Sequence, residues 1–331
     1  MFGLEELKSP VQDAAAPIHV EPMDTDQLKF LRKSLNTASL PEIKSLIEEE
    51  LMNYHQHGKI ELKKGDDIVI LEGEPRHYLF KEILEAVNCN IPVSLVGPAG
   101  SGKSTVVQQI ATALNLPYYL QNSVSGTHEL AGYMDAHGRY HGTSFRTAFE
   151  KGGVILIDEV DTSDASALKW INTALANGHA MFPDQDAPVQ RHENFRIVIA
   201  ANTFGTGADR VYVGANQLDA STLDRFVFFD FDYDLPLEVL LSGNKNWADR
   251  VQELRVAAAK ERARMVISPR ATIYGAKLLA IGWPQEIVEQ RLIWKGCDAE
   301  LKERIVKHCG TDAKAVNNVK KLDQKKKGRF H

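Results

Sequence analysis

Hydrophobic residues recur along this chain in two different spacings. From about Glu74 to Phe229, short apolar runs typical of buried strands alternate with stretches in which apolar residues recur every three or four positions, as in helices. The strand-like runs lie at residues 91–96, 118–120, 154–157, 197–200 and 226–229. Such alternation predicts an α/β fold with a parallel sheet covered by helices on both faces.

The pattern changes on either side of this segment. Beyond Pro236 the strand signals stop and helical spacing continues to Cys309, which predicts a smaller helical domain. Before Glu74, two helix-spaced segments precede the strand-like run at residues 68–71, and residues 1–26 show no periodicity. We therefore predict a mobile N-terminal arm (1–26), a small helical accessory region (27–73), an α/β domain (74–235), a helical domain (236–311) and a basic tail (312–331).

Composition narrows the class of protein. A chain of 331 residues with 44% hydrophobic residues is long enough for about two domains with a sizeable core. It contains no apolar stretch long enough to span a membrane and no N-terminal secretion signal. Its three cysteines are odd in number and widely spaced, which is typical of reduced thiols. We expect a cytoplasmic protein without membrane contact.

The charge is distributed unevenly. A net charge of −5 argues against nucleic-acid binding by the body of the protein. From Lys314 onward, however, the chain has seven basic residues and a single acid, Asp323. A solvated end is the favoured interpretation of this tail, and contact with nucleic acid or an acidic partner is the alternative.

One short segment carries a specific chemical signal. Residues 97–105 read GPAGSGKST and match the pattern GxxxxGK[ST] between a predicted strand and a predicted helix. In this pattern backbone N–H groups surround phosphates, Lys103 neutralises charge and the Ser104 hydroxyl coordinates Mg²⁺. The pattern predicts binding of a nucleoside triphosphate by Gly97, Pro98, Ala99, Gly100, Ser101, Gly102, Lys103, Ser104 and Thr105.

Polar residues follow two of the predicted strands. The segment VILIDEVD (154–161) places Asp158 and Glu159 at the carboxyl end of a buried strand, where parallel sheets bind ligands. We expect Asp158 to hold Mg²⁺ and Glu159 to polarise an attacking water molecule; a solvated strand end is the alternative. Asn202 ends the next strand and could reach the terminal phosphate or the water, although Asn at such a position is often a turn former.

Together these residues resemble the AAA+ ATPases. In that family an Asn one strand away from the acidic pair senses the terminal phosphate, as Asn202 would. The segment LDRF (223–226) resembles the element whose arginine, here Arg225, reaches the site of a neighbouring subunit. The segment SPR (268–270) resembles the second sensor: Ser268 would cap a lid helix, Pro269 would start it, and Arg270 would project from its first turn.

Within AAA+ the chain is most similar to the MoxR branch and to its CobS-like members. The residues that carry this likeness are GPAGSGKST, ELAGY (129–133), LIDEVD, SPR and the long segment from Ala200 to Phe226. The resemblance covers about residues 74–285 and includes two expected insertions, at 135–142 and 178–194. It implies that residues 74–235 are the AAA+ nucleotide-binding domain, that 236–311 are its lid, and that the cofactors are ATP and Mg²⁺.

The resemblance also implies an assembly and an activity. We expect an ATPase that forms a homo-oligomeric ring, with a hexamer as the leading number, because Arg225 would complete the adjacent site. A local pairing of Arg225 with Asp224 or another local acid is the alternative. The leading hypothesis is remodelling or activation of a partner protein, for example one with a von Willebrand A domain. The alternatives are the motor subunit of a metal chelatase, inserting cobalt or magnesium into a tetrapyrrole, and a DNA-dependent motor.

Overall fold

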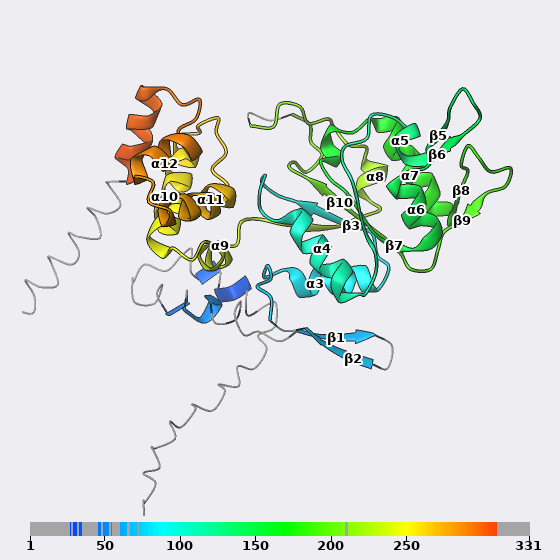
Figure 1. Cartoon of the computed structure of the whole chain (residues 1–331), viewed down its shortest axis with the longest axis horizontal. Helices are drawn as coiled ribbons and strands as arrows, with labels where there is room; N and C mark the ends of the chain where they lie inside the picture. The colour runs from blue at the N-terminus through cyan, green and yellow to red at the C-terminus, as the bar shows by residue number, and fades with distance from the viewer. Residues whose placement is uncertain are drawn as a thin grey trace, which may run out of the picture.

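The computed structural model describes most of the chain (Figure 1). The described residues are 27–54 without 28, 32, 35–45, 48 and 53, followed by 60–64, 67–71, 73–208 and 211–309. The predicted N-terminal arm (1–26) and basic tail (312–331) lie outside these residues. Their predicted properties therefore stay predictions.

A five-stranded sheet forms the centre of the fold. Its strands run in the order β11–β3–β10–β7–β4, and neighbouring strands are parallel throughout. The sequence prediction of a parallel α/β sheet is therefore confirmed. The strands are β3 (Val93–Val96), β4 (Tyr118–Gln121), β7 (Gly153–Ile157), β10 (Phe195–Ala201) and β11 (Val227–Asp230).

Helices cover both faces of this sheet. Along β7 the side chains alternate between two apolar clusters, because successive residues of a strand point to opposite faces. Val154 and Leu156 pack with residues of α3 and α4, whereas Ile155 and Ile157 pack with residues of α6 and α7. The helices of this part are α3 (Phe80–Asn88), α4 (Lys103–Ala113), α5 (His128–Ala131), α6 (Ser144–Lys151), α7 (Ala165–Asn177) and α8 (Ala220–Leu223).

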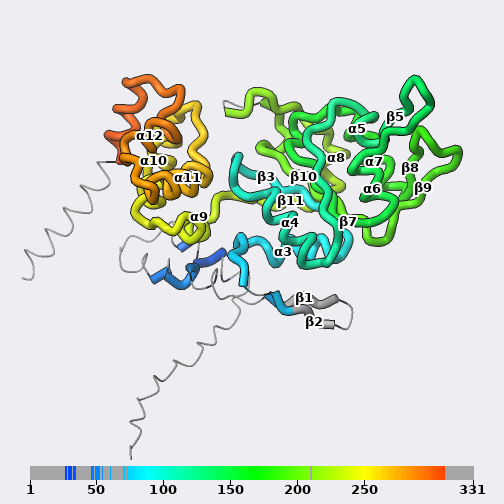
Figure 2. Tube along the Cα trace, in the orientation of Figure 1, coloured from blue at the N-terminus to red at the C-terminus, as the bar shows by residue number. Residues whose placement is uncertain are grey.

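Two short hairpins interrupt the alternation of strands and helices. β5 (Tyr133–Met134) pairs with β6 (Tyr140–His141), and β8 (His179–Ala180) pairs with β9 (Val189–Gln190), both antiparallel. They coincide with the two insertions that the sequence predicts. Figure 2 shows both hairpins at one end of the molecule, away from α9 to α12 at the other end.

The C-terminal part is helical, as the periodicity predicts. It contains α9 (Leu235–Ser242), α10 (Lys245–Lys260), α11 (Pro269–Ala280), α12 (Gln285–Leu292) and a further helix over 299–309. Trp247, Leu254, Val288 and Trp294 are buried in its separate apolar core. No helix in the described part of the chain is long and apolar enough to cross a membrane.

The predicted helical character of region 27–73 is incomplete. Its described residues between 27 and 54 are helical, but β1 (Ile60–Lys64) and β2 (Asp67–Leu71) form an antiparallel hairpin. The sequence predicts β2 from its run of branched residues. It does not predict β1, because the segment IELKK contains only two apolar residues and its pairing with β2 supplies what the local pattern lacks.

Candidate functional site

The segment GPAGSGKST forms the turn between β3 and α4. Gly100 and Gly102 have φ angles of +78° and +99°, which a residue with a Cβ adopts only under strain. Because α4 begins at Lys103, the first-turn N–H groups of this helix face the loop. A helix N-terminus with such donors favours anions. The loop lines a cavity of about 670 Å³, which is large enough for a nucleotide.

Lys103 lies almost wholly inside this site. Its Nζ donates to the carbonyl oxygens of Gly97 and Pro98, at 2.7 and 3.1 Å, and to Asn202 Oδ1 at 3.1 Å. Burial lowers the pKa of Lys103 to about 8, although the nearby charge of Asp158 opposes the shift. The ammonium group is therefore poised to gain stabilisation from an anionic ligand.

Ser104 and Asp158 meet across the cavity. The Ser104 Oγ donates to Asp158 Oδ2 at 2.9 Å, and Asp158 Oδ1 accepts from the backbone N–H of Glu159 at 2.9 Å. A hydroxyl and a carboxylate are the hard oxygen ligands that Mg²⁺ prefers in phosphate sites. The donor set present in this chain thus fits a magnesium ion.

Glu159 has an unusual backbone conformation. It is a non-glycine residue in the left-handed region, with φ 53° and ψ 39°, and lies two residues after the end of the buried strand β7. Such residues cost free energy and cluster at functional sites. The turn leaves Glu159 exposed and among the residues that line the cavity. A carboxylate held there can polarise a water molecule beside bound phosphates.

Sequence reasoning missed Asp161, the third acid of LIDEVD. Its carboxylate is 1% exposed, and Oδ2 accepts from the backbone N–H groups of Asn202 and Thr203, both at 3.0 Å, and from Thr203 Oγ1 at 3.1 Å. These bonds connect the segment that follows β7 with the segment that follows β10. The position of the acid in the motif was visible, but its partners follow from which strands are neighbours.

Helix α11 of the C-terminal part brings Arg270 to the same cavity. Ser268 occupies the N-cap position and Pro269 starts the helix, as predicted. The predicted side-chain cap is wrong, because the Ser268 hydroxyl makes no capping hydrogen bond. Ser268 instead packs against the phosphate loop: a Cβ built on Gly100 would lie 2.8 Å from Ser268 Cβ.

His77 closes another side of the cavity. Its ring stacks on Phe231 with centroids 3.8 Å apart and is 5% exposed. Nδ1 accepts from the backbone N–H of Leu79, which leaves Nε2 to donate to the carbonyl of Asp232 at 3.0 Å. His77 is among the cavity-lining residues, and the neighbouring Tyr78 is not.

Three predicted site residues do not line the cavity: Gly97, Pro98 and Arg225. Gly97 and Pro98 still contact Lys103 through their carbonyls, whereas Arg225 contacts none of the cavity residues described above. Arg225 is exposed, its Nη1 donates to the carbonyl of Ser221, and it lines a separate hollow of about 230 Å³. It forms no ion pair with any residue in the described ranges, so the alternative pairing with Asp224 is not observed.

Comparisons with known proteins agree with this fold. Residues 92–226 match the family model described as AAA domain (dynein-related subfamily). The denitrification regulatory protein NirQ of Pseudomonas aeruginosa is 28% identical over an aligned length of 237 residues, and the alignment covers 66% of this chain and 83% of NirQ. Midasin of Giardia intestinalis is 23% identical over an aligned length of 190 residues, and the alignment covers 53% of this chain but 4% of midasin.

Solved structures with a similar backbone include NtrX from Brucella abortus and a RuvB mutant from Thermotoga maritima. Each has a TM-score of 0.41 and 18% identity. They cover 84% and 62% of this chain, which spans 60% of the NtrX chain and 64% of the RuvB chain. The topology of the sheet and the phosphate loop between β3 and α4 are those of the AAA+ P-loop NTPase fold, and residues 92–226 of this chain are similar to the AAA domain.

Proposed function

We propose that this protein hydrolyses ATP in a Mg²⁺-dependent reaction and uses the energy to remodel or activate a partner protein. The observation that carries the proposal is the convergence of Lys103, Ser104, Asp158 and Asn202, linked by hydrogen bonds of 2.9 to 3.1 Å, with Glu159 on the same cavity. These groups supply a cation, two metal-ligand oxygens, an amide and a general base.

Each of these residues has its own role in the proposed reaction. Backbone N–H groups of the phosphate loop and the Lys103 ammonium bind the phosphates, and Ser104 and Asp158 hold the metal ion. When bound, Mg²⁺ neutralises charge on the phosphates. Glu159 orients the water and takes its proton, while Asn202 positions the water or the terminal phosphate. Arg270 brings a second cation from the lid.

We further propose that the site is shared between subunits of a homo-oligomeric ring, with six as the leading number. Arg225 supports this idea because it is exposed, lacks an acidic partner among the described residues and lies outside its own cavity. An arginine supplied by a neighbour typically accelerates phosphoryl transfer by about 10³ to 10⁵. In this proposal Arg225 meets the phosphates that are bound in the cavity of a neighbouring subunit.

A MoxR-type regulatory role is the specific form of the proposal. Its support is the likeness to NirQ, which covers two thirds of this chain and bears the name of a regulatory protein. The partner that we propose is a protein, such as one with a von Willebrand A domain. A Glu159→Gln variant should bind ATP without turning it over and retain this partner in pull-downs, with Lys103→Ala as the matched control. Retention of tetrapyrrole-binding subunits or of DNA would favour the chelatase or DNA motor instead.

Mixing two inactive variants tests the shared site. Arg225→Ala retains an intact cavity and Lys103→Ala retains an intact arginine, so each alone should show almost no ATPase activity. In mixed rings an intact cavity can face an intact Arg225, and activity should return in proportion to such interfaces. Activity that never returns at any mixing ratio, in rings shown to exchange subunits, would exclude the shared site.

A further inference from the structure

Two residues from the C-terminal side of the sheet touch the phosphate loop. The Tyr233 hydroxyl, in the segment between β11 and α9, donates to the carbonyl oxygen of Ala99 at 3.0 Å. Ser268, directly before α11, packs on Gly100 so closely that a Cβ there would lie 2.9 Å from its Oγ. Two adjacent residues of the phosphate loop, Ala99 and Gly100, are therefore contacted by the segment that leads to α9 and by the residue that precedes α11.

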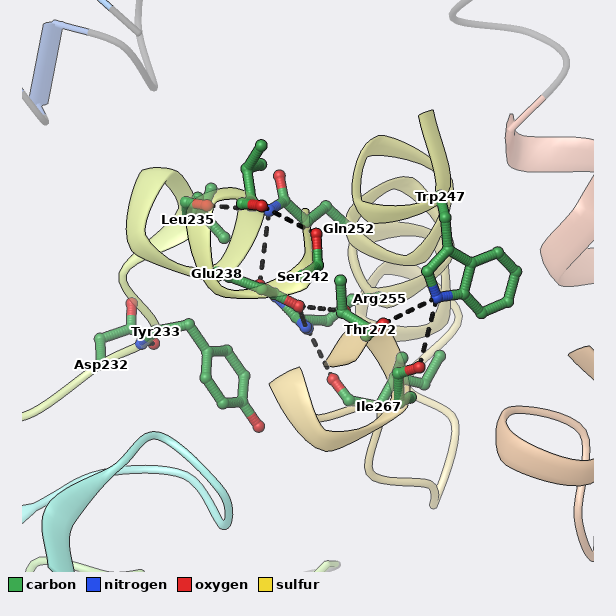
Figure 3. A network of polar contacts seen from close by, with 12 residues as sticks. Asp232, Tyr233, Leu235, Glu238, Ser242, Trp247, Gln252, Arg255, Ile267 and Thr272 are labelled. Atoms are coloured by element: carbon green, nitrogen blue, oxygen red, sulfur yellow. Dashed lines mark hydrogen bonds and ion pairs between the residues drawn. The ribbon is translucent and has the colours of Figure 1, made fainter. Parts of the chain in front are cut away.

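One side chain of α10, that of Arg255, contacts both Tyr233 and the residue that precedes Ser268. The guanidinium carbon of Arg255 is 4.3 Å from the centroid of the Tyr233 ring, a distance typical of a cation–π contact. The Nε of Arg255 donates to the carbonyl of Ile267 at 2.6 Å, and Ile267 immediately precedes Ser268. Figure 3 shows Arg255 beside Ile267 and Glu238, with the Tyr233 ring nearby.

Arg255 is itself held rigidly. Its Nη1 and Nη2 donate to the two carboxylate oxygens of Glu238 at 2.8 and 2.7 Å, and Glu238 is 2% exposed. Glu238 also accepts from the hydroxyl of Thr272, which lies two residues after Arg270 on α11. A planar guanidinium in a bidentate pair has little freedom. The network therefore joins α9, α10 and the first turn of α11.

We propose that Arg255 is a positioning residue that sets the phosphate loop and Arg270 relative to each other. The inference rests on the proposed ATP hydrolysis, in which both elements contact the nucleotide. Through Ile267 and Glu238, Arg255 controls where α11 starts; through Tyr233 it supports the carbonyl of Ala99. Movement of the lid that separates these groups breaks at least one of the contacts, so the geometry of the phosphate loop and of Arg270 change together.

A double-mutant cycle tests this coupling. Removing Arg255 alone leaves Glu238 charged and buried, so the variant combines Arg255→Met with Glu238→Gln, which keeps an acceptor for Thr272. ATPase rates are compared for the full chain, this pair variant, Arg270→Ala and all three changes together. We expect the pair variant to lose about tenfold in kcat, because coupled residues interact with energies of this order. The change Arg270→Ala should then reduce kcat far less in the pair variant than in the unmodified chain.

Arg250→Met is the matched control. Arg250 lies on the same helix and pairs with Glu289 at 3.2 Å, but it contacts neither the phosphate loop nor the segment before α11 in the described structure. The fold-loss in kcat caused by Arg250→Met and the fold-loss caused by Arg270→Ala should multiply when the two changes are combined. Tyr233→Phe is a second variant that removes only the hydroxyl; it should raise the KM for ATP about threefold, as the loss of one neutral hydrogen bond predicts.

The outcomes separate the inference from the proposed function. The positioning role would be overturned if the kcat losses of the pair variant and of Arg270→Ala simply multiply, as we expect for Arg250→Met. That result would leave the proposed ATP hydrolysis intact. An unmodified chain without ATPase activity would instead overturn the proposed function. An Arg270→Ala variant with full activity would leave ATP hydrolysis intact and overturn the positioning role, because Arg270 would then have no effect to be coupled. Thermal unfolding of each variant identifies misfolding. If the pair variant is unfolded, the cycle of Tyr233→Phe with Arg270→Ala decides, and multiplicative losses there also reject the coupling.

Discussion

The carboxylate of Asp161 accepts a hydrogen bond from the backbone N–H of Asn202 at 3.0 Å. This bond connects the helical turn that follows β7 with the amide residue that follows the neighbouring strand β10. Asn202 Oδ1 in turn accepts from Lys103 Nζ at 3.1 Å. A buried side chain that touches no part of the cavity thereby fixes the position of one that does.

Replacing Asp161 should therefore reduce catalysis more than nucleotide binding. In Asp161→Ala two backbone N–H groups and the Thr203 hydroxyl lose their acceptor, and we expect a loss of about 1 to 3 kcal/mol in the free energy of unfolding. We also expect kcat to fall by at least tenfold with little change in KM, because Asn202 shifts. Steady-state ATPase assays and denaturant unfolding measure both quantities.

Asp164→Ala provides the control for that experiment. Asp164 caps α7 through bonds to the N–H groups of Ser166 and Ala167 and is not among the cavity-lining residues. Its loss should cost about 1 kcal/mol of stability and leave kcat unchanged. An equal fall in kcat for both variants would mean that general destabilisation, not the position of Asn202, causes the effect.

Nucleotide affinity should depend on pH through Lys103. Burial lowers its pKa to about 8, and bound phosphates favour the protonated form, so the pKa rises on binding. Affinity should be highest below pH 8 and decline by up to about tenfold per pH unit above it, because the ammonium must first regain its proton. Calorimetric titrations near pH 9 in buffers of different ionisation enthalpy should reveal proton uptake, which should vanish near pH 6.5. Affinity that is constant from pH 7 to 9.5 would contradict this prediction.

Gly97 should not tolerate a side chain. A Cβ at this position would lie 2.0 Å from the backbone oxygen of Phe231, whose own N–H donates to Val96. Since a backbone atom cannot yield without separating the ends of β3 and β11, Gly97→Ala should cost about 3 kcal/mol and weaken nucleotide binding. Gly214→Ala, where a Cβ meets nothing within 4 Å, should change neither quantity. Thermal unfolding and binding of a fluorescent ATP analogue are the measurements.

The stability of the helical C-terminal part should depend on the Glu238–Arg255 pair. Glu238→Ala leaves the Arg255 guanidinium half-paired and the Thr272 hydroxyl without its carboxylate, so we expect a loss of about 3 to 5 kcal/mol. Glu289→Ala, which breaks the more exposed pair with Arg250, should cost less. Hydrogen exchange confined to α9, α10 and α11 would locate the effect, and equal losses in both variants would refute the ranking.

Much of the fold could be predicted because its signals are local. Apolar runs such as VILI predict buried strands, and the segment GPAGSGKST between a strand and a helix predicts a phosphate loop whatever the rest of the chain does. The periodicity beyond Pro236 predicts helices for the same reason. Where local apolar content is low, as in IELKK, the prediction failed and pairing with β2 determined the strand.

The sequence by itself determined the parallel α/β class, the helical C-terminal part and the chemical groups available for phosphate and metal. Only the tertiary structure decided which of these groups meet. The placement of β10 beside both β3 and β7 brings Asn202 to Lys103 and to Asp161, and the packing of α9, α10 and α11 places Arg255 behind the phosphate loop. Such contacts join residues from 12 to 99 positions apart. They depend on strand order and helix packing, which local spacing does not encode.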